Sequence, residues 1–183
     1  MKTLEDQMSF YAAYHQDARN KATHFVGVPL IVFSLMIPLG WLRADLGGFT
    51  LSAALAVSAV LFAYYLLLDV PLGLAMGVVF AALLLAAEPL SQAALGESLA
   101  WFLILFAGGW ALQLWGHVFE GRKPALADNL FQIFVAPIFL AAEVFFALGY
   151  KPALHASVQK RALDLRASAG IAESLNSAAR SAG

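Results

Sequence analysis

The chain contains no cysteine and only four histidines in 183 residues. The lack of cysteine excludes disulfide bonds, thiolate metal sites and cysteine-ligated iron–sulfur clusters. The G-x-S-x-G motif of serine hydrolases and a glycine-rich phosphate loop are also absent. The histidines are too few for a membrane di-iron desaturase, and none lies mid-segment, where a membrane b-type haem needs a pair. A mononuclear site with three histidine ligands, or two and a carboxylate, remains within this inventory.

Charged residues are scarce as well. They make up 13% of the chain, against about 25% in an average soluble domain. The net charge of −1 gives no basis for binding nucleic acid. In their place the chain has 61% hydrophobic residues, arranged in runs too long for a soluble core. The sequence therefore predicts an all-α, polytopic helical membrane protein surrounded by membrane lipid.

Five apolar segments are expected to build the membrane domain: 25–42, 49–68, 70–87, 99–116 and 130–149. The first four carry no charged residue, and each approaches the ~20 residues needed to cross about 30 Å of hydrocarbon. The sequence Asp69-Val70-Pro71 separates the second from the third, which predicts a tight hairpin between two crossings. Residues 43–48 and 88–97 are expected to be short loops on the opposite side.

The fifth segment differs because it carries Gln132, Pro137 and Glu143. A carboxylate in hydrocarbon marks a candidate functional site; the alternative is that Glu143 lies near the far interface, hydrogen-bonded to a neighbour. With four crossings, ten of the eleven Lys and Arg residues share the side of both termini, and Arg43 alone is opposite. We therefore predict four full crossings, a fifth helix that is re-entrant or bent at Pro137, and cytoplasmic termini. The membrane would be a bacterial inner membrane or, in a eukaryote, the endoplasmic reticulum.

The two ends of the chain lie outside these segments. Residues 1–24 are polar and aromatic, with apolar positions at helical spacing, which predicts an N-terminal helix at the membrane interface. Residues 168–183 are rich in Ala and Ser and are expected to form a flexible tail. The chain is thus divided into one transmembrane helical domain, residues 1–167, and the tail.

A first polar cluster precedes the first apolar segment and holds His15, Asn20 and His24. On one continuous helix, nine residues at ~100° each would place the two histidines on opposite faces. Binding of one metal by both therefore requires a break, for which Asn20 is a candidate break or cap, with Thr23 a candidate cap of the first membrane helix. Interfacial histidines without a metal role explain the same spacing.

A second cluster ends the fourth apolar segment, where Gln113, His117 and Glu120 share one helical face. A carboxylate one turn from a histidine can bind the same metal or orient the imidazole. The alternative is a helix end whose carboxylate pairs with Arg122 or Lys123. Counting the crossings brings this cluster to the same membrane face as the first one.

The two clusters read His15-x4-Asn20-x3-His24-x2-Gly27-Val28-Pro29 and Gln113-x2-Gly116-His117-x-Phe119-Glu120-Gly121-Arg122-x-Pro124-Ala125-Leu126. This pattern resembles a family of small membrane enzymes, the 2-hydroxy fatty acid α-dioxygenases, known from fungal phytosphingosine breakdown and from bacterial relatives. The resemblance extends from Phe10 to Leu154 and leaves the Ala/Ser-rich tail outside.

The resemblance implies an Fe(2+)-dependent α-oxidation. A 2-hydroxy fatty acid and O₂ would give the fatty acid one carbon shorter, CO₂ and water. The matching positions His15, His24 and His117 would be the metal ligands. His155 has no clear place in either motif, and we keep it as a candidate fourth ligand or nearby base.

For catalysis we select Glu120, to orient a histidine or accept the hydroxyl proton, together with Asn20. Four cations are candidates for attracting the substrate carboxylate, with ordinary positive-inside charge as the alternative for each: Arg19, Lys21, Arg122 and Lys123.

Two other function classes fit parts of the sequence. A non-catalytic membrane scaffold would need no metal, and its histidines would be merely interfacial. A small transporter is favoured by Glu143 and Pro137 in an apolar segment, although the chain shows no internal repeat. Close helix packing, within the chain or in a homodimer, is allowed by Gly73, Gly77, Gly108 and Gly109.

Overall fold

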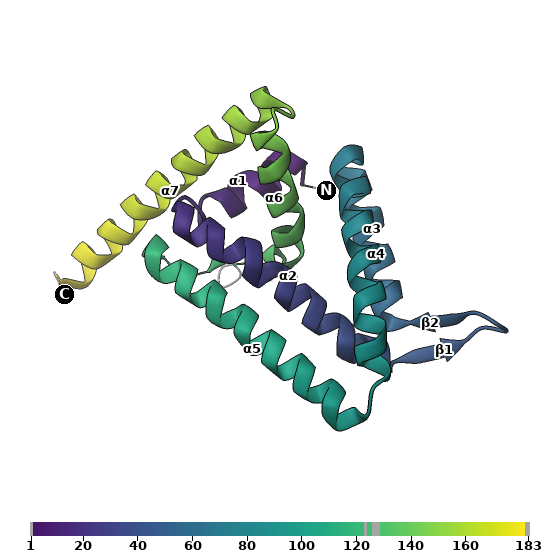
Figure 1. Ribbon diagram of the computed structural model, residues 1–183. Helices are drawn as coiled ribbons and strands as arrows, with labels where there is room; N and C mark the ends of the chain where they lie inside the picture. The colour runs from purple at the N-terminus through teal and green to yellow at the C-terminus, as the bar shows by residue number, and fades with distance from the viewer. Residues whose placement is uncertain (1, 123, 126–128, 182–183) are drawn as a thin grey trace.

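The computed structural model describes residues 2–122, 124–125 and 129–181, most of them helical (Figure 1). Lys123 and Leu126, both singled out in the sequence, lie outside the described residues. In chain order the elements are α1 (Leu4–Ala12), α2 (Ala18–Trp41), β1 (Arg43–Asp45), β2 (Thr50–Ser52), α3 (Ala53–Leu68), α4 (Val70–Gln92), α5 (Leu95–Glu120), α6 (Gln132–Ala147) and α7 (Pro152–Ser181). The predicted all-α class is confirmed, with one short antiparallel hairpin, β1–β2, in addition.

Three of the described helices, α2, α4 and α5, are long and apolar enough to cross a membrane. Helices α3 and α6 are apolar too, but each has only 16 residues. At ~1.5 Å per residue that is about 24 Å, against about 30 Å of hydrocarbon. The second predicted segment is shortened because residues 50–52 pair with 43–45 in the hairpin, and Ser52 then caps α3. Hydropathy does not distinguish such a strand from the helix that follows it.

The helix break required between the first two histidines lies at residues 13–17, where α1 has ended and α2 has not begun. Asp17 caps α2 by accepting a backbone N–H of its first turn at 2.8 Å. Asn20 and Thr23, the predicted break and cap, lie inside α2, so that prediction is wrong. The interfacial helix expected at the N-terminus is accordingly divided by a linker.

Helices α2 and α5 lie side by side and antiparallel (Figure 1). Their approach depends on glycine, because a Cβ built on Gly109 or Gly116 would lie 2.7 or 2.2 Å from a side chain of α2. Gly73 and Gly77 of α4 press against α3 in the same way, whereas Gly108 has nothing within 4 Å of its Cβ position. Contacts inside the chain therefore account for most of the small residues, and the homodimer stays a prediction.

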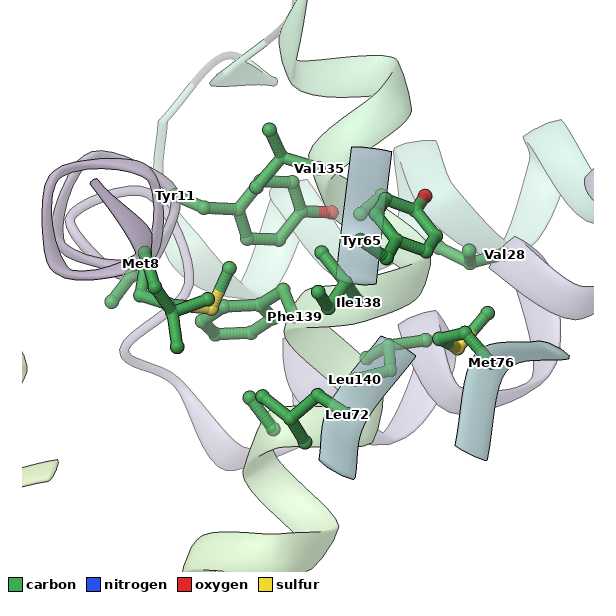
Figure 2. Packing of buried hydrophobic residues seen from close by; sticks show 14 of the residues in the cluster. Met8, Tyr11, Val28, Tyr65, Leu72, Met76, Val135, Ile138, Phe139 and Leu140 are labelled. Atoms are coloured by element: carbon green, nitrogen blue, oxygen red, sulfur yellow. The ribbon is translucent and has the colours of Figure 1, made fainter. Parts of the chain in front are cut away.

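Helix α6 lies at the centre of the apolar core, packed between α1 and the α3–α4 hairpin (Figure 2). Ile138 and Phe139 are almost fully buried, and Tyr11 of α1 packs on Phe139 with ring centroids 4.5 Å apart. On the other side, the Tyr65 hydroxyl of α3 donates to the Phe134 carbonyl at 2.7 Å. The fifth apolar segment thus joins the N-terminal helix to the hairpin.

Polar contacts tie the C-terminal end of α6 to its neighbours. Asp69, at the turn between α3 and α4, accepts hydrogen bonds from Lys151 at 2.6 Å and from Tyr150 at 3.2 Å. Glu143 of α6 pairs with Lys21 of α2 at 2.7 Å. Glu143 is therefore a paired carboxylate, as the second interpretation of the sequence expected, but its partner stands at the start of α2 and not at the far interface.

Helix α7 runs alongside α1 (Figure 1). Arg161 of α7 pairs with Asp6 at 2.7 Å, and the Ser157 hydroxyl donates to Glu5 at 2.6 Å. The helix continues to Ser181, through most of the segment expected to be a flexible tail, while residues 182–183 lie outside the described part. The division of the chain into a domain and a flexible tail stays a prediction.

Candidate metal centre

The structure brings three of the four histidines together in the interior. His15 comes from the linker after α1, His24 from α2 and His117 from α5, and one nitrogen of each lies within 4.8 Å of the others. The three residues are 1%, 3% and 7% exposed. The linker turns the chain, so that histidines nine residues apart reach the same point from two directions.

The backbone fixes the orientation of two of these rings. His15 donates through Nδ1 to the Tyr11 carbonyl at 2.7 Å, and His24 donates through Nδ1 to the Asn20 carbonyl at 2.8 Å. A carbonyl can only accept, so each Nδ1 carries the proton and each Nε2 of the neutral ring is a bare lone pair. The two Nε2 atoms lie 3.1 Å apart. Two facing acceptors at this distance repel each other unless a cation binds them both.

The third histidine also has an unused nitrogen. Nδ1 of His117 is buried and has no hydrogen-bond partner among the described residues. Burial, followed by the neighbouring His24 ring, holds the pKa of His15 well below its usual range. A neutral imidazole is the form that binds metals. Three buried imidazoles with free nitrogens fit a first-row transition ion, which prefers such ligands.

Tyr11 belongs to this site, although the sequence pattern predicts only an interfacial helix for residues 1–24. Its ring stacks on His15 with centroids 4.0 Å apart and an angle of 5° between the planes. Its carbonyl also accepts the His15 proton, so one residue sets both the tilt and the tautomer of that ring. The four-residue spacing between Tyr11 and His15 was the available signal.

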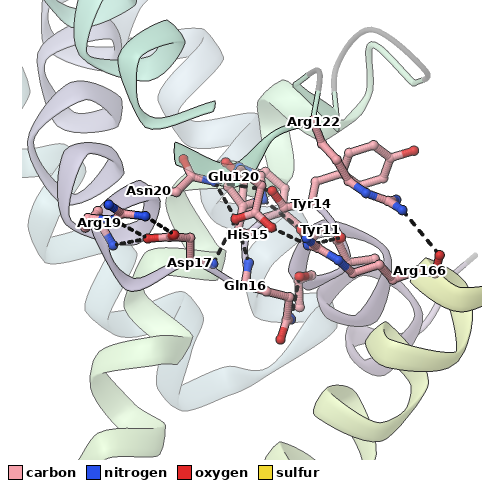
Figure 3. Close-up of polar contacts among 12 residues, drawn as sticks. Tyr11, Tyr14, His15, Gln16, Asp17, Arg19, Asn20, Glu120, Arg122 and Arg166 are labelled. Carbon is pink, nitrogen blue, oxygen red and sulfur yellow. Dashed lines mark hydrogen bonds and ion pairs between the residues drawn. The ribbon is translucent and has the colours of Figure 1, made fainter. Parts of the chain in front are cut away.

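Glu120 holds the surroundings of the histidines in position (Figure 3). Its Oε2 accepts the backbone N–H groups of Gln16 and Asp17 at 3.0 and 2.8 Å, and the Asn20 amide at 3.1 Å. Its Oε1 pairs with Arg166 of α7. Glu120 therefore fixes the linker and the start of α2 to the end of α5, three residues beyond the histidine of that helix.

Asn20, the other residue selected for catalysis, lies between Glu120 and the linker. Its Nδ2 also donates to the Tyr14 carbonyl at 3.3 Å, while its Oδ1 is buried without a partner among the described residues. Gly116 allows this approach, because a Cβ there would lie 2.5 Å from that Oδ1. Both selected residues thus adjoin the histidines, and their roles remain proposals.

The two α2 cations predicted to attract a carboxylate are already paired. Arg19 pairs with Asp17 at 2.8 Å, and this contact lowers the pKa of Asp17 to about 2. Its guanidinium also lies 4.6 Å from the centroid of the Phe119 ring. Lys21 pairs with Glu143. Neither cation lies among the residues that line the histidine cavity.

The side chains of Arg122 and His155 have partners other than the three histidines. Arg122 donates to the Arg166 carbonyl at 3.4 Å. His155 stacks on Phe146 with centroids 4.7 Å apart, and its Nε2 is 3.5 Å from the Gln159 amide. The structure therefore does not support His155 as a fourth ligand, because α7 carries it to the far end of α6.

A partly open cavity adjoins the histidines. Tyr11, Gln113 and Gln132 line it, together with apolar side chains of α2, α5 and α6. Its apolar wall includes Val28 and Ile31, one and two turns beyond the histidine of α2. None of the described lining residues carries a formal charge.

The fold and the site define a helical membrane protein with a buried three-histidine centre beside an apolar cavity. The chain belongs to the Mpo1-like family, since the family model described as 2-hydroxy-palmitic acid dioxygenase Mpo1-like matches residues 1–148. It is 38% identical over 159 residues to 2-hydroxy-palmitic acid dioxygenase MPO1 of Saccharomyces cerevisiae, covering 85% of this chain and 87% of the yeast protein. No solved structure gives a significant match. The resemblance found in the sequence is confirmed, and with it the prediction of a dioxygenase.

Proposed function

We propose that this protein is an iron(II)-dependent dioxygenase that converts a 2-hydroxy fatty acid and O₂ into the fatty acid one carbon shorter, CO₂ and water. Atoms balance in this reaction without an external reductant. The observation that carries the proposal is the buried group of three imidazoles, in which one nitrogen of each lies within 4.8 Å of the others and the bare nitrogens of His15 and His24 face each other. The name of the yeast relative, a 2-hydroxy-palmitic acid dioxygenase, supports the substrate class.

His15, His24 and His117 would hold the iron. Imidazole ligands suit iron(II), and three of them leave coordination positions for other groups. Bound iron would supply the one-electron chemistry through which O₂ reacts with an organic acid. The chain's own contribution is to keep each ring neutral and oriented, through the carbonyls of Tyr11 and Asn20 and through burial.

The substrate would enter with its polar end at the histidines and its acyl chain along the apolar wall. Val28 and Ile31 lie one and two turns from His24 on α2, and Trp110 lies two turns from His117 on α5. An acyl chain beside them would lie along the two helices, toward the hydrocarbon of the bilayer. Such an apolar wall excludes water. It would therefore keep a reactive species in the site from being lost to solvent.

Glu120 and Asn20 would act as positioning residues. All the donors around the Glu120 carboxylate come from the linker, α2 and α7, so its contacts support a role in orienting histidines over one in accepting a substrate proton. Loosening this carboxylate would let the linker move relative to α5. The distance between His15 and His117 would then no longer be fixed.

We further propose four crossings, by α2, α3, α4 and α5, with a re-entrant α6 and both termini in the cytoplasm. The contacts of α7 support this arrangement. It starts beside Lys151, which pairs with Asp69 at the α3–α4 turn, and farther along it pairs through Arg166 with Glu120 at the end of α5. Helix α7 thus lies near both ends of the segment that connects α5 to α7 and contains α6. This suits a re-entrant segment, which enters and leaves the membrane through the same face. The positive-inside bias favours the cytoplasm for that face, in a bacterial inner membrane.

The test compares two histidine variants of the detergent-purified protein after anaerobic loading with Fe(II). We expect stoichiometric iron in the wild type and in His155→Ala, and loss of both iron and O₂ consumption with 2-hydroxyhexadecanoic acid in His117→Ala. His155→Ala is the matched control, because it removes an imidazole that lies outside the group. A wild type that binds no first-row metal would overturn the proposal and leave a non-catalytic scaffold as the better interpretation. Full iron content in His117→Ala would remove that residue from the ligands.

A further inference from the structure

Two buried glutamines line the same cavity as the histidines, and each has a buried amide oxygen without a partner among the described residues. Gln132, the first residue of α6, is 1% exposed, and both of its amide atoms lack a hydrogen-bond partner among the described residues. Gln113, one turn before His117 on α5, is 6% exposed, and its Oε1 is likewise unpartnered. Burying an unpaired amide is unfavourable, so these atoms call for a partner beyond the described residues, and a bound ligand is one.

A third buried glutamine, which lies outside the cavity, has a hydrogen-bond partner within the chain. Gln7 of α1 is as buried as the other two, but its amide donates to the Tyr64 hydroxyl at 3.1 Å. Gln7 does not line the histidine cavity. The unpaired amide atoms, Oε1 of Gln113 and both polar atoms of Gln132, are therefore a local property of the cavity.

We propose that Gln132, assisted by Gln113, recognises the polar end of the 2-hydroxy acid, an inference that rests on the proposed function. The Gln132 N–H would donate a hydrogen bond to a carboxylate oxygen, and its carbonyl would accept a hydrogen bond from the 2-hydroxyl group. An amide suits this ligand because it presents a donor and an acceptor side by side, as a hydroxy acid presents an acceptor and a donor on adjacent carbons.

The absence of charge among the described residues that line the cavity favours recognition by amides over recognition by cations. Arg19 and Lys21 are engaged with carboxylates elsewhere, and no described lining residue is charged. A lysine or arginine would offer donors only, and would bind any fatty acid carboxylate equally well. The carbonyl of Gln132 requires a donor, which the 2-hydroxyl supplies and a plain fatty acid lacks.

This arrangement predicts selectivity for the hydroxylated acid. A site built around a buried hydrogen bond to a hydroxyl rejects the analogue without it, because the buried acceptor is left unpaired. If the acyl chain enters from the bilayer, as proposed above, plain fatty acids would compete for the same apolar wall, and such a group discriminates against them. Gln132 supplies it on this reading, and Gln113 contributes a second contact to the carboxylate.

The experiment measures binding and stability separately in the full-length Fe(II)-loaded protein under anaerobic conditions. Dissociation constants for 2-hydroxyhexadecanoic and hexadecanoic acid are followed by tryptophan fluorescence, since Trp110 lines the cavity. Gln132→Met keeps the length of the side chain and removes both polar atoms. We expect at least tenfold weaker binding of the hydroxy acid and a smaller loss for the plain acid, whose carboxylate also loses the Gln132 donor. Iron should be retained, and the melting temperature should be unchanged or higher. The higher melting temperature would reflect removal of an unpaired amide.

Gln7→Met is the matched control, because it removes a paired glutamine outside the cavity. We expect it to lower the melting temperature and to leave both dissociation constants unchanged. The role of Gln132 would be overturned if Gln132→Met weakened the binding of both acids equally, or left the discrimination between them unchanged. It would also be overturned if the variant lost iron and had a lowered melting temperature. A wild type that binds neither acid would instead overturn the proposed function itself, and this result appears before any substitution is made.

Discussion

Two buried polar clusters of this protein differ in how their atoms are satisfied. Asp69 accepts hydrogen bonds from the Leu72 backbone N–H at 3.1 Å, from Tyr150 and from Lys151, so both of its oxygens are occupied. Around the histidines, unpartnered buried atoms collect instead, on the following described residues: Asn20, Gln113, His117 and Gln132. The first cluster is complete within the described residues, whereas the second has unpartnered atoms that a bound ligand would satisfy.

The difference separates polar groups that hold helices together from polar groups that await a ligand. A buried polar atom without a partner costs free energy, so selection for stability alone would remove it. Single cases are not informative: Ser9 Oγ and Glu143 Oε1 are also unpartnered among the described residues, and neither lines the cavity. The concentration of such atoms around three histidines is what points to function.

Glu120 tests the comparison most strongly, because it is fully paired like Asp69 but contacts the histidine linker. Glu120→Gln removes the ion pair with Arg166 and turns an N–H group toward other donors. We expect turnover to fall about 10- to 100-fold, as for other groups that orient metal ligands, with a smaller loss of iron. Steady-state O₂ consumption and iron analysis of the same preparations measure the two effects.

Arg161→Met is the control for Glu120→Gln, since it removes the other ion pair of α7, with Asp6, and leaves Glu120 untouched. We expect its turnover to match the wild type. Complete loss of iron in Glu120→Gln would make the carboxylate a metal ligand, contrary to its contacts. Wild-type turnover in that variant would show that the linker keeps its position without the carboxylate.

The two sequence motifs predict the histidine group well, because each motif lies at a helix end and the crossings between them can be counted. The long helices α2, α4 and α5 also follow from hydropathy. The break at residues 13–17 does not, since it depends on Asp17 capping α2. The four cations were assigned by charge alone, and the structure pairs Arg19 and Lys21 with nearby carboxylates.

The site residues that the sequence does not predict are those that tertiary packing brings to the histidine cavity. Gln132 was noted only as a polar residue in an apolar run, because its neighbours across the cavity come from α2 and α5. The shortness of α3 results from pairing between β1 and β2, which apolar composition conceals. Local pattern thus predicts which residues are chemically able to act, while packing decides which of them meet.

Alanine variants of Gly116 and Gly108 sharpen the comparison, because they separate the effect of helix propensity from the effect of close packing between α2 and α5. Gly116→Ala would place a Cβ 2.2 Å from the Thr23 hydroxyl and 2.5 Å from Asn20 Oδ1, so α2 and α5 must separate or Asn20 must leave Glu120. We expect a loss of about 1–3 kcal/mol in stability, as for other overpacked sites, together with weaker iron binding. Thermal unfolding in detergent and metal titration are the measurements.

Gly108→Ala provides the matched control on the same helix, because nothing lies within 4 Å of its Cβ position. Alanine is the better helix former, so we expect a gain of up to about 1 kcal/mol with unchanged iron binding. If both variants behaved alike, the close approach at Gly116 would not govern the histidine geometry.

The smallest effect is expected at the complete cluster, where Asp69→Asn leaves an acceptor for Leu72 and Tyr150 but removes the charge that faces Lys151. Lys151 is about half exposed and can return to water, so the lost ion pair is worth only about 1 kcal/mol. Asp164→Asn, at an exposed position of α7, is the control and should change nothing measurable. We expect Asp69→Asn to lower the melting temperature slightly and to keep full iron content and turnover. A loss of turnover without a loss of stability would mean that the Asp69 cluster acts on the histidine site through the end of α6, despite its complete pairing. Pairing alone would then not distinguish structural from functional polar groups in this fold.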